Sequence, residues 1–382
     1  MVLSRTGESM WSVVVVLYAL NHFHSPLLAG IAAAVSQIPT RLLAPLAGTL
    51  LDRHGRTRLV LLDYLLATTS IASIGVLALV DQLSASLFVA ICAVAGLTNI
   101  LSATGLRSLF PLLLPRPLWD RANAVDSASY VAANLVGPAL AGTLVAVGGG
   151  EVAIFAAAIV FAGAVIACIG LVDPPSLADT SESVWRGAWT GLRYVLHNRT
   201  LVGLAVVLSS VNFGMGILIV ALPVLVLSHL GGSPAIVGLL FTISAVAGLG
   251  SGVVFGKIGS DDRERLWLTA SCLGIAAALV LLGLAGSLAV VVVAMIVLGF
   301  CNGPMDIALF SLRQRRTEPA MLGRALAISM ALNGTGQPFG SLTAGVLVLV
   351  SPGLAFTVAA VVVGLSALTV YAMIPRRADI VP

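Results

Sequence analysis

The sequence predicts an all-α membrane protein in which twelve transmembrane helices form two pseudo-symmetric six-helix bundles. Three observations predict this: few charged residues, recurring long apolar runs, and an internal duplication. Of the 382 residues, 59% are hydrophobic and 9% are charged, and the mean hydropathy is +1.07. Soluble domains average about 25% charged residues, so this chain has too few to cover a water-facing surface.

The apolar runs have the length of membrane spans, because about 20 helical residues cross roughly 30 Å of hydrocarbon. Helices are expected because each span must satisfy its own backbone hydrogen bonds in lipid. The period-two polarity of barrel strands is missing from these runs. The predicted spans are 3–22, 27–50, 58–80, 84–112, 121–147, 152–172, 199–227, 234–257, 265–285, 288–312, 321–347 and 353–374.

The basic residues predict the topology. All of the 20 Lys and Arg except Arg41 lie at the N-terminus, in connections that follow even-numbered spans, at the helix ends beside them, or after the last span. The positive-inside rule therefore puts both termini in the cytoplasm. The net charge of +4 reflects this sorting and does not indicate nucleic acid. A single Lys among many Arg favours a bacterial source, and hence a bacterial cytoplasmic (inner) membrane.

Enzyme and cofactor signatures are missing from the sequence. The 4 Cys lie singly in different spans, without CxxC spacing, and the 5 His lie near loops without forming a larger cluster. The sequence has no Walker-type G-x-x-x-x-G-K-S/T motif, which would indicate ATP binding, and no HExxH motif, which would indicate a zinc site. We therefore expect neither enzyme activity nor a cofactor or metal. No cleavable signal peptide is recognised before the first span.

An internal duplication predicts two halves of the same orientation. The stretch "GTLLDRHGRTRLV" recurs as "GVVFGKIGSDDRERL", with Gly55 over Gly259, and "HSP" recurs as "GSP", with Pro26 over Pro234. A parallel repeat places a substrate site between the halves near the bilayer midplane. The expected parts are a bundle over 1–173, a cytoplasmic linker over 174–198, and a bundle over 199–382. By repeat symmetry span 1 lacks about ten residues, which indicates a late start or a short span.

The linker contains a candidate interfacial helix. In "VWRGAWTGLRYVLHN", the residues Trp185, Trp189, Leu192 and Leu196 share one helical face. An amphipathic helix with this pattern lies at the membrane surface. It either straps the two halves together or regulates them.

At the loop between spans 2 and 3 the chain resembles the major facilitator superfamily, whose signature reads G-x-L-x-D-R-x-G-R-K/R. Thr57 departs from the pattern, where a second basic residue is usual. The resemblance implies a gating loop whose Asp52 faces the N-terminal end of span 11 near Arg324, while Arg53 and Arg56 hold the turn. The matching and neighbouring residues are Gly48, Leu50, Asp52, Arg53, Gly55, Arg56 and Arg58.

Span 5 resembles the G-x-x-x-G-P-x-x-G-G signature of the superfamily's proton-coupled exporters. In "AANLVGPALAG" the residues Gly137, Pro138 and Gly142 match, and Ala replaces the other two Gly. Small residues permit close helix contact and Pro bends the helix. Other stretches resemble the branch with macrolide, multidrug and enterobactin exporters. The resemblance implies efflux in exchange for protons. Uptake of a metabolite with protons, a lipid flippase or scramblase, and a receptor remain alternatives.

Charged residues inside spans each need a partner or a function, because one at the bilayer centre costs at least about 2.5–3.5 kcal/mol. Equal depth along neighbouring spans predicts a Glu8–Arg41 pair, either a fixed ion pair or a proton-responsive one. The same count predicts an Arg107–Asp126 pair, with a structural role favoured, although Asp126 is also a candidate for proton coupling.

Asp306 is the second proton-coupling candidate in the sequence. It follows "CNGP", where Gly303 and Pro304 loosen the helix, and the facing part of span 11 offers no base. An acid without a nearby cation favours its protonated form away from water, as a proton carrier requires. The alternative is a solvated acid that faces the cytoplasm.

The resemblance implies that spans 1, 4, 7 and 10 line the substrate cavity. Their few polar residues lie among many Val, Leu, Phe and Met, which indicates an apolar cavity suited to small amphipathic molecules. The expected partners are this substrate, protons and the bilayer, without nucleic acid, and the expected state is a monomer. The candidate substrate contacts, besides the charged residues, are Asn21, Asn99, Thr104, Asn212 and Asn302.

Overall fold

The protein is all-helical in the part of the chain that the structure, a computed structural model, describes. Seven helices among the described residues are long and apolar enough to cross a membrane. The all-α class predicted from the sequence is therefore confirmed. The described residues are 1–42, 50–51, 54–97, 101–102, 105, 115, 118–170, 184–260, 262–318 and 321–375.

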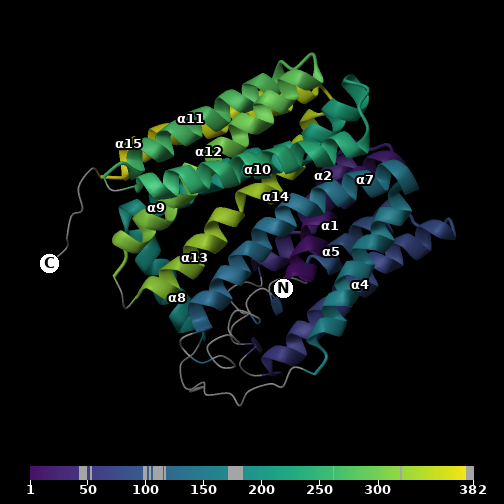
Figure 1. The fold of residues 1–382 in the computed structure, drawn as a ribbon, viewed down its shortest axis with the longest axis horizontal. Coiled ribbons are helices and arrows are strands. Elements are labelled where there is room, and N and C mark those ends of the chain that lie inside the picture. The colour runs from purple at the N-terminus through teal and green to yellow at the C-terminus, as the bar shows by residue number, and fades with distance from the viewer. Residues whose placement is uncertain are drawn as a thin grey trace. The chain divides into compact units, whose positions relative to one another are not determined.

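The contacts divide the chain into two compact units (Figure 1), which are taken separately below. The first comprises Met1–Ser181 and Gly231–Thr242, and the second comprises Glu182–Leu230 and Ile243–Pro382. The bundle and linker borders expected from the sequence remain predictions.

Helix α1 packs along α7 in the first unit. Two predicted spans, 121–147 and 152–172, belong to the single element α7, which is interrupted at Gly149 with φ 86°. Only glycine adopts this left-handed backbone freely, so Gly149 is the point where the chain reverses. The helices are α1 Val2–His22, α2 Pro26–Val35, α4 Arg56–Leu79, α5 Ala85–Ala95 and α7 Trp119–Cys168.

In the second unit, α9 lies between α14 and α15, and α11 packs on α12 and α15. Span 11, predicted as one helix, consists of α13 and α14, which meet at Thr335. The elements that lie wholly or mostly in this unit are α8 Val184–His197, α9 Arg199–Val224, a π-helical turn Leu225–His229, α10 Pro234–Ile258, α11 Glu264–Gly283, α12 Leu288–Arg315, α13 Leu322–Gly334, α14 Gly336–Leu347 and α15 Pro352–Met373.

The internal duplication has a counterpart in the backbone. Gly55 and Gly259, aligned in sequence, both adopt positive φ, at 89° and 76°. Helices α2 and α10 both begin at the Pro of a Ser-Pro pair, Pro26 and Pro234. Proline suits the first helical position, since its missing N–H has no helical partner there. The two repeats therefore reuse the same turn chemistry at matching positions.

Helix α8, in the predicted linker, is docked on the second unit. Val195 is buried in a cluster with Leu201 of α9 and Ala325 of α13. The hydroxyl of Tyr194 accepts a hydrogen bond from the backbone N–H of Glu318 at 3.0 Å. The predicted apolar face is not the docking face, because Trp189 and Leu196 remain 68% and 58% exposed. Helix α8 packs on the second unit through Val195, so the face with Trp189 and Leu196 points away from that unit.

Candidate functional site

Asp126, a predicted proton-coupling candidate, forms an ion pair with Arg5 that sequence reasoning missed. The carboxylate of Asp126 on α7 lies 2.6 Å from Nη2 of Arg5 on α1. Nη1 of Arg5 also donates to the backbone carbonyl of Asp126 at 2.7 Å. The side chains are only 11% and 6% exposed, and the guanidinium lies 5.5 Å from the centre of the Tyr130 ring. This pair joins the first turn of α1 to the N-terminal part of α7.

Removing either charge should leave the other buried without its partner. We expect Arg5→Met or Asp126→Leu to lower the free energy of unfolding by about 3–5 kcal/mol, the cost of breaking a buried pair. The double variant should regain most of the loss, because apolar replacements of both partners are close to neutral. Thermal unfolding in detergent measures the stability of the two single variants and of the double variant. Additive losses in the double variant would contradict the pairing.

Glu8 and Arg41 lie on the described parts of α1 and of the second span. Glu8 is half-buried. Nε of Arg41 is buried and, within the described residues, has no hydrogen-bond partner. The expected Glu8–Arg41 pairing remains a prediction.

Asp306 lies on α12 with an exposed side chain. Sequence reasoning did not consider Arg313, which lies about two helical turns farther along α12 on the face that carries Asp306. The expectation that Asp306 lacks a local cation considered only the facing span, and it stays a prediction. Arg313 is 2% exposed, and its Nε and Nη2 have no hydrogen-bond partner in the described part of the structure. Its guanidinium carbon lies 5.8 Å from the centre of the Phe310 ring, within cation–π range.

The polar candidates for substrate contact differ in their surroundings. Nδ2 of Asn212 on α9 donates to the carbonyl of Asn333 on α13 at 3.0 Å, so this side chain bridges two helices. Asn302 on α12 is half-buried, and Asn21 at the end of α1 is exposed. Asn302 and Asp306 are four residues apart, which places them on one face of α12.

The three motif residues of span 5 all lie at close helix contacts. A Cβ at Gly137 would meet Ser9 and Met10 of α1. A Cβ at Gly142 would meet the backbone of Pro234 and Gly238 at the start of α10, and one at Gly238 would meet the carbonyl of Pro138. Hence the small residues of the motif allow α7 to touch two helices, as the sequence pattern indicated.

The loop between spans 2 and 3 is described only around the start of α4. Gly55, with φ 89°, precedes α4 directly, and Arg56 and Arg58 belong to its first turn. Arg324 belongs to the first turn of α13, and its side chain lies outside the described residues. The remaining candidates, which also lie outside the described residues, are Gly48, Asp52, Arg53, Asn99, Thr104 and Arg107.

Asp63 shows a further contact that sequence reasoning missed. This acid of α4 is 3% exposed. Its carboxylate accepts a hydrogen bond from the backbone N–H of Ser102 at 2.8 Å. It thereby ties α4 to the fourth span.

The family model that describes the Major Facilitator Superfamily matches residues 1–215 and 204–380. The chain is 33% identical to the uncharacterized MFS-type transporter y4rN of Sinorhizobium fredii, over 98% of this chain and 93% of that protein. It is 25% identical to the multidrug efflux pump Tap of Mycolicibacterium fortuitum, over 89% and 85%. It is 22% identical to macrolide efflux protein A of Streptococcus pyogenes, over 88% and 84%.

A crystal structure of the nucleoside transporter NupG is similar in fold throughout. The TM-score is 0.75 at 12% identity, with 97% of this chain and 96% of that chain covered. At this identity the likeness concerns the fold alone. The two-bundle architecture predicted from the sequence is confirmed.

Proposed function

Because the chain belongs to the major facilitator superfamily, we propose that this transporter exports small amphipathic organic compounds in exchange for protons. One observation carries the proposal: over most of its length the chain is similar to a multidrug efflux pump and a macrolide efflux protein. Both halves would rock about a central site in alternating access. The chain would lie in a bacterial cytoplasmic membrane as a monomer, with both termini inside.

Two features of the helices support proton-coupled export. The exporter-like residues Gly137, Pro138 and Gly142 form the close contacts of α7 with α1 and α10. Glu8 and Asp306 supply acids inside two spans, α1 and α12, that line the cavity in this family. Acids within spans are costly and usually mark proton or substrate pathways.

Everted vesicles with an imposed pH gradient test the direction and the coupling. Acidifying the vesicle interior should drive accumulation of ethidium or a macrolide, and a protonophore should abolish it. Vesicles without the protein give the baseline. Accumulation that survives the protonophore contradicts proton exchange. Accumulation only under the opposite gradient indicates proton-coupled uptake instead.

A further inference from the structure

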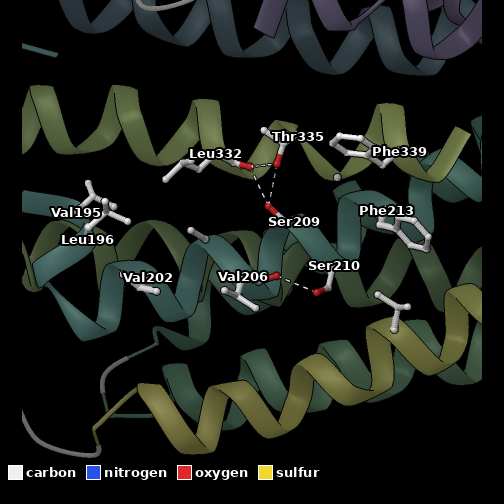
Figure 2. A pocket seen from close by; sticks show the side chains of 13 residues that line it. Val195, Leu196, Val202, Val206, Ser209, Ser210, Phe213, Leu332, Thr335 and Phe339 are labelled. Atoms are coloured by element: carbon white, nitrogen blue, oxygen red, sulfur yellow. Dashed lines mark hydrogen bonds between the residues drawn. The ribbon is translucent and has the colours of Figure 1, made fainter. Parts of the chain in front are cut away.

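The second unit contains a cavity of about 500 Å³ (Figure 2), which falls within the ~300–1,000 Å³ of small-molecule sites. It lies over α9, between the α13–α14 junction and α15, and α8 closes one end. Figure 2 shows Val195 and Leu196 at that end and Phe213 toward the other. The proposed transport mechanism does not use this cavity.

The lining offers a ligand no spare hydrogen-bond donor. The hydroxyls of Ser209 and Thr335 both donate to the carbonyl of Leu332, at 2.8 and 2.7 Å. The Ser210 hydroxyl donates to the carbonyl of Val206 at 2.9 Å. The remaining lining side chains are apolar, and none is charged. A mostly hydrocarbon segment of a ligand therefore fits this lining best.

The end closed by α8 is bordered by exposed cations. Arg193 lies three residues before the lining residue Leu196, and Arg199 lies three residues before the lining residue Val202, so each is a neighbour on its helix face. Both arginines are exposed. Arg199 uses Nη2 to donate to the carbonyl of Ala372 at 2.7 Å, which leaves its other N–H groups for a ligand.

The residues at the α8 end of the cavity are of the kinds found at a membrane surface. Trp189 and Leu196 are 68% and 58% exposed on α8, beside the basic Arg193. Exposed apolar residues next to arginine are typical of helices that lie among lipid headgroups. The apolar cavity would thus extend into the hydrocarbon while its cationic end stays at the phosphates.

We propose that this cavity binds an acyl chain of an anionic phospholipid, whose phosphate is held by Arg193 and Arg199. The apolar lining selects the hydrocarbon, and the two arginines select the negative headgroup. A bound lipid would tie α8, α9 and α15 together. Lipid composition would then affect the stability of the second unit independently of substrate export.

Native mass spectrometry of the purified full chain tests the site directly. The delipidated protein is titrated with phosphatidylglycerol and, separately, with phosphatidylcholine of identical chains. We expect phosphatidylglycerol to bind more tightly. Arg193→Gln and Arg199→Gln should each weaken phosphatidylglycerol binding about fivefold, since one arginine contributes about 1 kcal/mol near anionic lipid. Either change should weaken phosphatidylcholine binding much less, because the choline cation of that lipid offsets the charge of its phosphate.

Filling the cavity should remove the binding of both lipids. Val206 lines the cavity and is 43% exposed, so Val206→Trp adds volume there without disturbing the core. The matched control is Leu368→Trp on α15, at a 66% exposed residue outside the lining. Ser210→Leu serves as a second variant if Val206→Trp does not fold.

Two outcomes would overturn the proposal. One is lipid binding by the filled variants that equals that of the wild type. The other is displacement of the lipid by ethidium at transport concentrations, which would make the cavity part of the substrate path. Loss of vesicle transport with intact, arginine-dependent lipid binding would leave this site standing and refute only the proposed export.

Discussion

The Asp306→Asn variant is expected to reduce pH-gradient-driven accumulation of ethidium in everted vesicles to the level of vesicles without the protein. The asparagine keeps the size of the side chain but cannot exchange a proton. An acid within the span α12 is costly, and a proton relay gives it a function. The Asp306→Glu variant keeps a carboxyl group and should retain part of the accumulation.

The matched control for Asp306→Asn is Glu318→Gln, which changes an exposed acid after α12 to its amide. It should accumulate ethidium as the wild type does. Exchange of labelled for unlabelled ethidium across the vesicle membrane, measured without a pH gradient, distinguishes a defect in proton coupling from a defect in substrate binding. This exchange should persist in Asp306→Asn, because substrate binding and rocking remain. Loss of both activities would show that Asp306 holds substrate, and full pH-driven accumulation would exclude it as the proton carrier.

Arg313 is a buried cation on the same helix as Asp306, and the sequence alone did not reveal its burial. Asp306 and the buried Arg313 lie about two turns apart on one face of α12, so their opposite charges should attract each other. Protonation of Asp306 would leave Arg313 without that attraction, and Arg313 has unbonded N–H groups among the described atoms. Neutralising Asp306 would therefore change the electrostatics of the C-terminal half of α12 as well as the proposed proton site.

Helix positions could be predicted from the sequence because hydropathy and turn residues act locally. Pro26 and Pro234 begin helices as their Ser-Pro pairs indicated, and the chain reverses at Gly149 between two apolar runs. The left-handed backbone at Gly55 and Gly259 explains why the repeated loop kept these glycines. Each of these signals lies within a few residues of the feature it predicts.

Side-chain partners were harder to predict because they depend on how helices cross. Counting residues from a turn gives the depth of a charge but not its direction around the helix. Depth alone gave Asp126 the partner Arg107, which lies outside the described residues, and it did not reveal Arg5, which contacts Asp126 from the start of α1. Arg313 lies in the last turn of α12, and only the packing around it reveals that it is buried.

The crossing of α9 and α14 should be the contact in the second unit that tolerates least change. A Cβ at Gly336 would meet the carbonyl oxygen of Ser209, and one at Gly340 would meet that of Phe213. Backbone carbonyls of a helix cannot turn aside as a flexible side chain can. We therefore expect Gly340→Ala to lower the free energy of unfolding by about 1–3 kcal/mol, as overpacking does, and Gly340→Val to lower it further.

The control for Gly340→Ala is a glycine-to-alanine change that should stabilise the protein. Gly250 lies exposed within α10, and a Cβ there would meet nothing within 4 Å. Because alanine favours the helix over glycine, Gly250→Ala should raise the free energy of unfolding by up to about 1 kcal/mol. Thermal unfolding in one detergent compares the two variants. A Gly340→Ala variant as stable as the wild type would show that α9 and α14 can separate without cost, and close glycine packing would then not hold this unit together.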